Sequence, residues 1–406
     1  MRRIGIVGAG QSGLQLGLGL LHHGYAVTLL SDRSGEEIRA GRVTSSQCMF
    51  DSALRHERDL GICFWDGVAP DVVGIEFTAA TPDATKALSW CGFFDAPAHS
   101  VDQRVKMPHW LDEFSRRGGD LQIVNAGISD LESLAKRCDL VLVAVGKGEL
   151  GDLFARDEKR SAFDRPMRAL ALTYVNGRKF GGNAGVVSFN AIPGVGEYFC
   201  VSALTTTGPC DIMIFEGVPG GPMDVWERVT SPSQHLETSL ALLREHLPWE
   251  YERTRDCTLT DDFGILSGRF TPTIRRPVAT LPSGARVLGV ADAVCLNDPI
   301  TGQGSNNASK CAAIYMASIL EREEKAFDVG WMESTFERYW SYARFVTDWT
   351  NGMLLPPPPH VQRLLAEGDH SERIRHWFAN GFDDPRRFYP MIVDPEAADR
   401  FLAATE

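Results

Sequence analysis

The first thirty residues combine two apolar runs with a glycine-rich turn and a helical stretch. An apolar run at Ile4–Val7 precedes the cluster Gly8–Gly13, which leads into an apolar helical stretch at Leu14–Leu21 and a second β-like run at Tyr25–Leu30. Short apolar runs bounded by glycine are typical of buried strands, and a longer periodic stretch is typical of a helix. This order predicts a strand–turn–helix–strand unit.

Two later segments have the same buried-strand character. Leu140–Val145 is followed by glycine, and Val287–Asp292 precedes a second glycine-rich turn. Near-continuous apolar runs are typical of parallel strands that are covered on both faces. We therefore expect both segments in the same parallel sheet as the first strand. The residues from Gly302 to Phe327 carry apolar side chains at helical spacing and predict a long, half-buried helix.

Between residues 166 and 275 the pattern changes to short β-like segments separated by glycine and proline. Such spacing predicts an antiparallel sheet in a second domain. One helix, predicted at His235–Leu247, interrupts it. The predicted strands are Arg168–Val175, Ala184–Phe189, Tyr198–Leu204 and Asp211–Glu216.

Composition narrows the class of protein and its partners. The 406 residues are 44% hydrophobic and 23% charged, which is typical of a globular chain of two or three domains. The net charge of -12 disfavours nucleic acid and an anionic membrane surface as partners. The nine cysteines are odd in number and form no Cys-x-x-Cys pair, which indicates reduced thiols and a cytoplasmic location. We expect no targeting segment, no membrane span and no metal site.

The glycine cluster after the first strand has the spacing Gly-x-Gly-x-x-Gly. Glycines at this spacing allow a tight turn and let backbone N–H groups approach a pyrophosphate at a helix N-terminus. The alternative is a glycine-packed crossover that binds nothing. We predict that the turn binds a dinucleotide through Gly8, Gly10, Gln11, Ser12 and Gly13.

The end of the second strand departs from the usual dinucleotide pattern. Ser31 stands where an acidic residue normally binds the adenosine ribose. We therefore expect Asp32 or Arg33, which follow directly, to hold this part of the ligand, or the ribose to be held more weakly.

A second glycine turn lies near the other end of the chain and opens the long helix. A carboxylate after a strand can hold the ribityl chain of a flavin, and a helix N-terminus offers N–H groups to an anionic isoalloxazine. The alternative is an ordinary turn with helix-capping residues. The predicted flavin contacts are Asp292, Pro299, Gly302, Gln303, Gly304 and Asn306, and Arg42 and Gly146 complete the predicted cofactor site.

With these turns the chain resembles the oxygenase component of the two-component, FAD-dependent styrene and indole monooxygenases. The resemblance covers nearly the whole chain and rests on four segments: Arg3–Gly10, Val145–Lys147, Asp298–Pro299 with Gly302–Gly304, and Thr347–Asn351. It implies an α/β fold, α+β overall, like that of p-hydroxybenzoate hydroxylase. A Rossmann-like FAD-binding domain carries an inserted antiparallel β-sheet substrate domain and C-terminal helices.

The resemblance also supports a division of the chain. We predict a discontinuous FAD-binding domain of residues 1–70, 100–165 and 276–330, a β-rich substrate domain of residues 71–99 and 166–275, and a C-terminal helical region of residues 331–406.

The resemblance implies that FAD arrives reduced, by diffusion, from a transiently bound NADH-dependent flavin reductase. Single-component relatives carry an Asp-Gly motif that contacts flavin and NADPH, whereas this chain has Val145–Gly148 in its place. The expected substrate is a small aromatic molecule, and a homodimer stays open.

Residues at the predicted substrate pocket indicate the indole branch. After Arg42, the styrene branch has Asn, Val and His at alternate positions, whereas this chain has Ser45, Gln47 and Met49. The implied reaction is epoxidation of the indole double bond to give indoxyl and then indigo. The predicted wall is Met49, Val72, Ile75 and Ala98, and the predicted catalytic positioning groups are Ser45, Ser46, Gln47, Pro299 and Gly302. The alternative for Thr44–Phe50 is a plain half-buried strand.

Three other functions stay open from the sequence. The first is a styrene-type alkene epoxidase, and the second is a self-contained NAD(P)H-dependent aromatic hydroxylase. The third is a non-catalytic FAD-binding protein. A Trp-x-Trp-x-Ile motif, which would favour a halogenase, does not occur.

Overall fold

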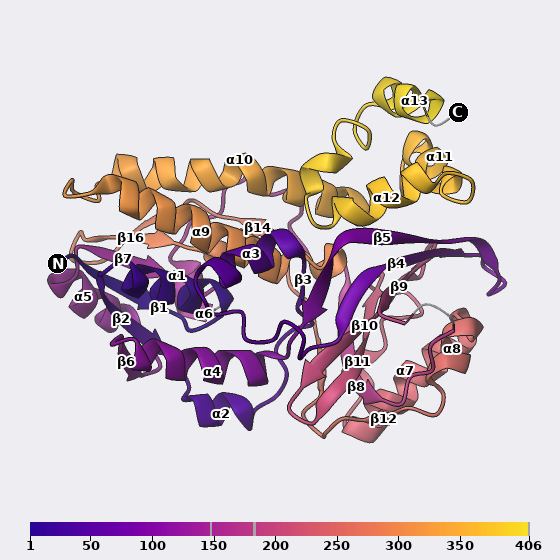
Figure 1. The fold of residues 1–406 in the computed structure, drawn as a ribbon, viewed down its shortest axis with the longest axis horizontal. Helices are drawn as coiled ribbons and strands as arrows, with labels where there is room; N and C mark the ends of the chain where they lie inside the picture. The colour runs from indigo at the N-terminus through magenta and orange to yellow at the C-terminus, as the bar shows by residue number, and fades with distance from the viewer. Residues whose placement is uncertain (147, 182–183, 405–406) are drawn as a thin grey trace.

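The computed structural model in Figure 1 describes residues 1–146, 148–181 and 184–404, which form two large sheets with helices around them. The first is a six-stranded sheet in the order β15-β16-β7-β1-β2-β6, in which all neighbours among the described strands are parallel except β15 and β16. Its strands are β1 (Arg3–Val7), β2 (Ala26–Ser31), β6 (Asp120–Ile123), β7 (Leu140–Val143), β15 (Val278–Thr280) and β16 (Arg286–Gly289).

The order of strands reverses at β1. The chain runs outward from β1 to β2 and β6, then returns to place β7 and β16 on the other side of β1. Open α/β sheets bind ligands outside the carboxyl ends of their strands at such a switch point. The topology therefore marks the end of β1 as a binding position.

Helices cover both faces of this sheet because successive residues of a strand point to opposite faces. On one face, a Cβ on Gly5 of β1 would meet Leu134 of α5. On the other face, the next residue, Ile6, lies against Gly17 of α1. Gly17 in turn lies against Phe114 of α4. The helices associated with this sheet are α1 (Gln11–His22), α2 (Gly35–Arg39), α3 (Asp51–Asp59), α4 (Gln103–Arg116), α5 (Ile128–Arg137), α6 (Gly148–Asp152), α9 (Gly304–Arg322) and α10 (Val329–Met353).

The second sheet has nine strands, and its path runs β12-β8-β11-β10-β9-β4-β5-β3, with β13 also paired to β8. Among the described pairs only β4 and β9 are parallel, so the predicted antiparallel sheet contains one parallel pair. Its strands are β3 (Cys48–Met49), β4 (Asp71–Ala80), β5 (Lys86–Ser100), β8 (Ala169–Asn176), β9 (Val186–Ile192), β10 (Gly196–Thr205), β11 (Gly208–Gly217), β12 (Thr258–Leu259) and β13 (Ile265–Gly268).

Helices also cover the second sheet. α7 (Pro232–His246) and α8 (Pro248–Thr254) lie on one side, and α12 (Glu372–Gly381) packs on β5, as Figure 1 shows. Aromatic rings fill the core beneath α12, where the Phe77 ring centroid lies 5.1 Å from that of Phe189 and 5.5 Å from that of Phe378. The remaining elements are α11 (Pro359–Glu367), α13 (Pro395–Ala403), the short sheet of β14 (Thr273–Ile274) with β17 (Cys295–Leu296), and 3-10 turns at Trp226–Arg228, Ala291–Ala293, Pro299–Thr301 and Pro385–Phe388.

Several element boundaries differ from those predicted. α7 begins at Pro232 because Ser231 caps it and proline suits the first helical position. The long helix begins at Gly304, since the residues Pro299–Thr301 form a 3-10 turn first. Only Cys48–Met49 of the alternating stretch Thr44–Phe50 forms a strand. Among the described helices, none combines the length and the apolar character that crossing a bilayer requires.

Candidate functional site

A cavity of about 550 Å³ opens at the carboxyl ends of β1, β2, β6 and β7. It therefore lies at the switch point of the parallel sheet, where ligands of α/β folds bind. Its lining contains five of the predicted cofactor residues, Gly8, Gly10, Asp32, Arg33 and Arg42. The rest of the lining is Val7, Ala9, Leu30, Ser31, Ile38, Thr44, Gln103, Arg104, Met107, Val124, Asn125, Ala126, Gly127, Ala144, Val145, Gly148, Glu149 and Leu150.

The three glycines of the first turn have three different surroundings. Gly8 has a φ of +110°, and a Cβ there would lie 2.7 Å from the Ala144 carbonyl oxygen. A Cβ on Gly13 would lie 1.9 Å from the Gly8 carbonyl oxygen, so this glycine lets α1 pack closely on the turn. A Cβ on Gly10 would meet nothing within 4 Å. Gly10 thus leaves open space at the N-terminus of α1, where backbone N–H groups can bind a pyrophosphate.

The predicted residues Gln11 and Ser12 are buried at the start of α1 and are absent from the cavity lining. Gln11 Nε2 donates to Gln15 Oε1 at 3.0 Å and to Glu57 Oε1 at 2.8 Å. The side chain of Gln11 is therefore engaged inside the protein, and its backbone is the part that lies in the glycine turn.

The end of β2 offers charged side chains to the cavity. Ser31 is fully buried, and its hydroxyl donates to the Arg33 carbonyl oxygen at 2.6 Å, which shapes the turn. Asp32 and Arg33 point outward, with side chains 62% and 42% exposed, and pair with each other at 3.4 Å. Both residues line the cavity, and their role at the ribose or phosphate end of a dinucleotide stays a prediction.

The second glycine turn lies beside the first helix. Gln15 of α1 donates to the Ser309 carbonyl oxygen of α9 at 3.0 Å, so the two helices contact each other at their second turns. Gly302 has a φ of +64°, and a Cβ on Gly302 or Gly304 would meet nothing within 4 Å. The turn therefore exposes backbone on an open side, although neither glycine lines the cavity.

Side chains of the second turn hold it in place from within. Asn306 accepts from the Phe50 backbone N–H at 2.9 Å and donates to the Cys48 carbonyl oxygen at 2.8 Å. Gln303 donates to the Phe382 carbonyl oxygen at 2.8 Å. These predicted cofactor residues are thus bound to the protein's own backbone, which leaves the backbone of Pro299–Gly304 as the part available to a flavin.

The other predicted cofactor residues lie at the ends of β7 and β16. A Cβ on Gly146 would lie 2.7 Å from Asp292 Cβ, so the two strand ends approach each other closely. Both strands are neighbours in the parallel sheet, which places Asp292 at the same edge as the first glycine turn. Lys147, which contributed to the family resemblance, lies outside the described residues.

Sequence reasoning missed a buried cluster of carboxyl groups behind the second turn. Glu197 and Glu216 are directly opposite each other on β10 and β11, and Glu216 also contacts Asp298, the residue before Pro299. Arg168 is the cation among them, and it binds Glu197 through two bonds of 2.7 and 2.9 Å. The sequence signal that could have revealed this cluster is Glu197, which is the one acidic residue of the otherwise mostly apolar strand β10.

The cluster cannot hold three full negative charges in a buried place beside one guanidinium. Burial, followed by the charge of Asp298, raises the pKa of Glu216, and burial raises the pKa of Asp298 to about 6. Burial therefore disfavours the charged form of both carboxyl groups. Asp298 also accepts from the Ile300 backbone N–H at 3.2 Å, which couples this pair to the second turn.

The predicted positioning groups of residues 45–47 form a hydrogen-bonded set. Ser45 Oγ donates to Gln47 Oε1 at 2.7 Å and accepts from Gln103 Nε2 at 2.9 Å. Tyr174 donates to the Ser45 carbonyl oxygen at 2.9 Å. The side-chain oxygen of Gln47 is therefore already engaged by a hydrogen bond from Ser45. The adjacent Ser46 is half-buried.

Three of the four predicted wall residues lie together. Val72, Ile75 and Ala98 are buried in one apolar cluster of the second sheet, and Val72 pairs with Ala98 across β4 and β5. Met49 belongs to a separate small cluster with Ala53 and Leu54. None of the four lines the 550 Å³ cavity.

Comparisons with known proteins agree with this architecture. A family model described as "Styrene monooxygenase A putative substrate binding domain" matches residues 146–253. The styrene monooxygenase StyA of Pseudomonas fluorescens is 29% identical over 405 residues, which cover 97% of this chain and 96% of the relative. The protein of the same name from Pseudomonas sp has the same identity and coverage.

Solved structures show the same fold at low sequence identity. The flavin-dependent brominase Bmp2 superposes with a TM-score of 0.66 at 13% identity, covering 99% of this chain and 98% of the other. The Y270F mutant of the oxygenase MHPCO gives a TM-score of 0.58 at 15% identity, covering 97% and 96%.

The fold is that of the FAD-dependent monooxygenases and halogenases. The open space at Gly10 and the cavity beyond it fit the pyrophosphate and adenosine parts of FAD. Over its full length the chain is similar to the styrene monooxygenase StyA, at 29% identity.

Proposed function

We propose that this chain is the oxygenase of a two-component system, which takes reduced FAD from a separate NADH-dependent flavin reductase and uses dioxygen to epoxidise the double bond of indole. The observation that carries the proposal is the glycine turn Gly8–Gly13 at the switch point of the parallel sheet, in a chain that is similar to StyA over its full length. FAD supplies the activation of dioxygen when it is bound.

The chain's own residues would bind and orient the cofactor. The turn Gly8–Gly13 and the N-terminus of α1 would bind the pyrophosphate, and Arg33 and Arg42 would lie along the phosphate and ribose end. The backbone of Pro299–Gly304, at the start of α9, would stabilise a negative flavin ring. Asp292 would hold the ribityl chain from the end of β16.

The substrate side would act by positioning and by excluding water. Val72, Ile75 and Ala98 provide a buried apolar wall, and such a wall suits a flat aromatic substrate. The residues Ser45, Gln47 and Met49 favour indole over styrene in this proposal, and a styrene-type epoxidase is the alternative. Holding the double bond in a fixed orientation supplies rate without a strong acid or base.

The test is product formation by the purified chain. Photochemically reduced FAD, air and indole are mixed with the protein in the presence of catalase, and indoxyl is followed by its oxidation to indigo. We expect pigment that depends on the protein, and catalase excludes free peroxide as the oxidant. FAD binding without any oxygenated product would contradict the proposal and favour a non-catalytic flavin protein.

A second assay tests the reductase requirement. The chain, oxidised FAD, NADH and indole are mixed without a reductase, and NADH absorbance is recorded. We expect no consumption of NADH above the protein-free rate. Rapid consumption would favour the self-contained hydroxylase instead.

Location and domain division are part of the same proposal. All nine cysteines lie within the described residues and are free thiols, which supports a reducing compartment such as the cytoplasm. We also propose that the chain divides into an FAD-binding domain, a substrate domain and a C-terminal helical region, with the predicted ranges.

A further inference from the structure

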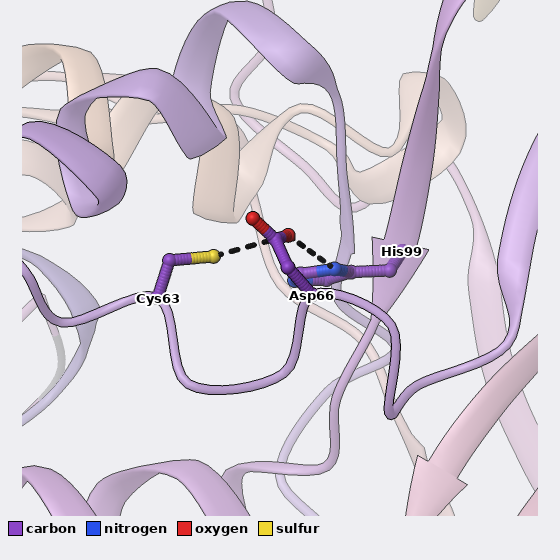
Figure 2. Close-up of side chains that lie close together, drawn as sticks. All are labelled: Cys63, Asp66 and His99. Carbon is purple, nitrogen blue, oxygen red and sulfur yellow. Dashed lines mark hydrogen bonds and ion pairs between the residues drawn. The ribbon is translucent and has the colours of Figure 1, made fainter.

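Three side chains with metal-binding chemistry converge outside the cavity. Cys63 and Asp66 lie in the loop after α3, and His99 lies near the end of β5, as Figure 2 shows. Cys63 Sγ lies 3.3 Å from Asp66 Oδ1, and His99 Nδ1 lies 3.6 Å from the same oxygen. One ligand atom from each residue lies within 4.8 Å of the other two.

This spacing is close to that of a tetrahedral metal site. Zinc binds sulfur, nitrogen and oxygen at about 2.0–2.3 Å, so neighbouring ligand atoms of a tetrahedron are about 3.3–3.8 Å apart. The two contacts to Asp66 already lie within that range. Only a small closure of Cys63 toward His99 is needed to complete the geometry.

Asp66 is oriented by a second residue, which binds one of its carboxylate oxygens more closely than the other. Arg58 Nε donates to Asp66 Oδ2 at 2.7 Å, while its contact to Oδ1 is longer, at 3.2 Å. Arg58 is also held by Asp51 at 2.7 Å. Metal-ligating carboxylates are commonly oriented by such hydrogen bonds on the other oxygen. The oxygen that faces Cys63 and His99 is therefore the one suited to a metal.

The local charges allow a cation at this place. The ammonium of Lys106 lies 2.5 Å from Glu57 Oε1 and is compensated by that carboxylate. Asp66 is 44% exposed at its side chain, which provides an entry path and room for a water ligand.

We propose that Cys63, Asp66 and His99 form a binding site for a borderline-soft divalent cation such as Zn²⁺, with a water as the fourth ligand. The cation would fasten the loop after α3 to β5. His99 pairs with Met49 of β3 and follows Ala98, so the site braces the strands that carry predicted wall residues. None of the three ligands belongs to the proposed flavin site, so the metal site can be tested independently of the proposed reaction.

Cobalt titration of the full chain tests the site, since Co²⁺ reports thiolate ligation by its colour. The chain is first treated with a chelator and then titrated with Co²⁺. We expect a thiolate-to-cobalt charge-transfer band that saturates at one equivalent and disappears when Zn²⁺ is added. Cys63→Ser should abolish the band, and His99→Gln should weaken Co²⁺ binding at least tenfold.

The matched control is Cys91→Ser, because Cys91 is a half-buried cysteine on the same strand β5. This variant should keep the band. Asp66→Asn provides a further variant at an exposed side chain, and circular dichroism shows that each variant is folded. A folded wild-type chain without the band, or a band that survives in Cys63→Ser, overturns the proposal.

Thermal melting gives a second readout that needs no colour. A ligand that binds the folded chain alone raises its melting temperature. We expect Zn²⁺ to raise the melting temperature of the wild-type chain and of Cys91→Ser, and to leave that of Cys63→Ser unchanged. An equal shift in all three overturns the assignment to Cys63.

Discussion

The two glycine turns are held in place in different ways. The first is shaped largely by its own backbone, since Gly13 lets α1 approach the carbonyl oxygen of Gly8, although Gly8 also lies against Ala144 at the end of β7. The second is held by side chains that reach distant segments, with Asn306 bound to Cys48 and Phe50. The comparison shows that one half of a cofactor site can be a local feature of the chain while the other half depends on the assembled fold.

The largest expected effect is on the free energy of unfolding, when a side chain is added at Gly13 in the first glycine turn. Gly13→Ala places a Cβ 1.9 Å from the Gly8 carbonyl oxygen, and both segments are backbone, so neither can give way easily. We expect the free energy of unfolding to fall by about 3 kcal/mol or more, or the chain to fail to fold. Chemical denaturation measures this, and a stability within 1 kcal/mol (about fivefold in the equilibrium constant) of wild type would contradict the close approach.

The next effect concerns the acid pair behind the second turn. Glu216 has a folded-state pKa above its ordinary value of 4.5, so the folded chain binds more protons than the unfolded chain as pH rises above that value. Its contribution to stability is therefore present at low pH and is lost as pH rises. Glu216→Gln keeps a donor for Asp298 and cannot titrate.

We expect the free energy of unfolding of wild type to fall more steeply than that of Glu216→Gln as pH rises above 4.5, the ordinary pKa of the carboxyl group, by up to about 1.4 kcal/mol per pH unit. Denaturant titrations at several pH values measure both slopes. Glu333→Gln, at an exposed glutamate on α10, is the control and should match wild type. Identical slopes for all three chains would rule out a raised pKa of Glu216.

A smaller effect separates binding from folding at the first turn. Gly10→Ala adds a Cβ into open space, so the free energy of unfolding should change by less than about 1 kcal/mol. The same Cβ occupies the approach of the pyrophosphate, and we expect FAD affinity to fall about tenfold, or about 1.4 kcal/mol. Equilibrium binding followed by flavin fluorescence measures the affinity. An unchanged affinity would show that the pyrophosphate does not bind next to Gly10.

The smallest effect concerns substrate choice. Ser45 connects Gln47 and Gln103 by hydrogen bonds, and Ser45→Asn replaces the hydroxyl with a larger amide. We expect the ratio of indole to styrene turnover to fall a few-fold, a difference of about 1 kcal/mol between the two barriers. Competition between the two substrates in one reaction measures the ratio, and an unchanged ratio would count against Ser45 as a specificity residue.

The wall residues show why a pocket is harder to predict than a turn. Val72 and Ile75 are three positions apart and would face opposite sides of a regular strand. They share one cluster because the β4–β5 register shifts between Val72 and Gly74. Met49, by contrast, packs with Ala53 and Leu54, where Lys106 Nζ approaches its sulfur at 3.1 Å.

The amino-acid sequence by itself determined the strand–turn–helix unit, its glycine cradle and the α/β class, because these depend on φ angles and apolar periodicity within short segments. Only the tertiary structure decided that Glu216 meets Asp298, and that Cys63 and Asp66 meet His99. Such contacts join residues that are distant along the chain. Their geometry arises when sheets and loops assemble, and periodicity within a short segment carries no information about it.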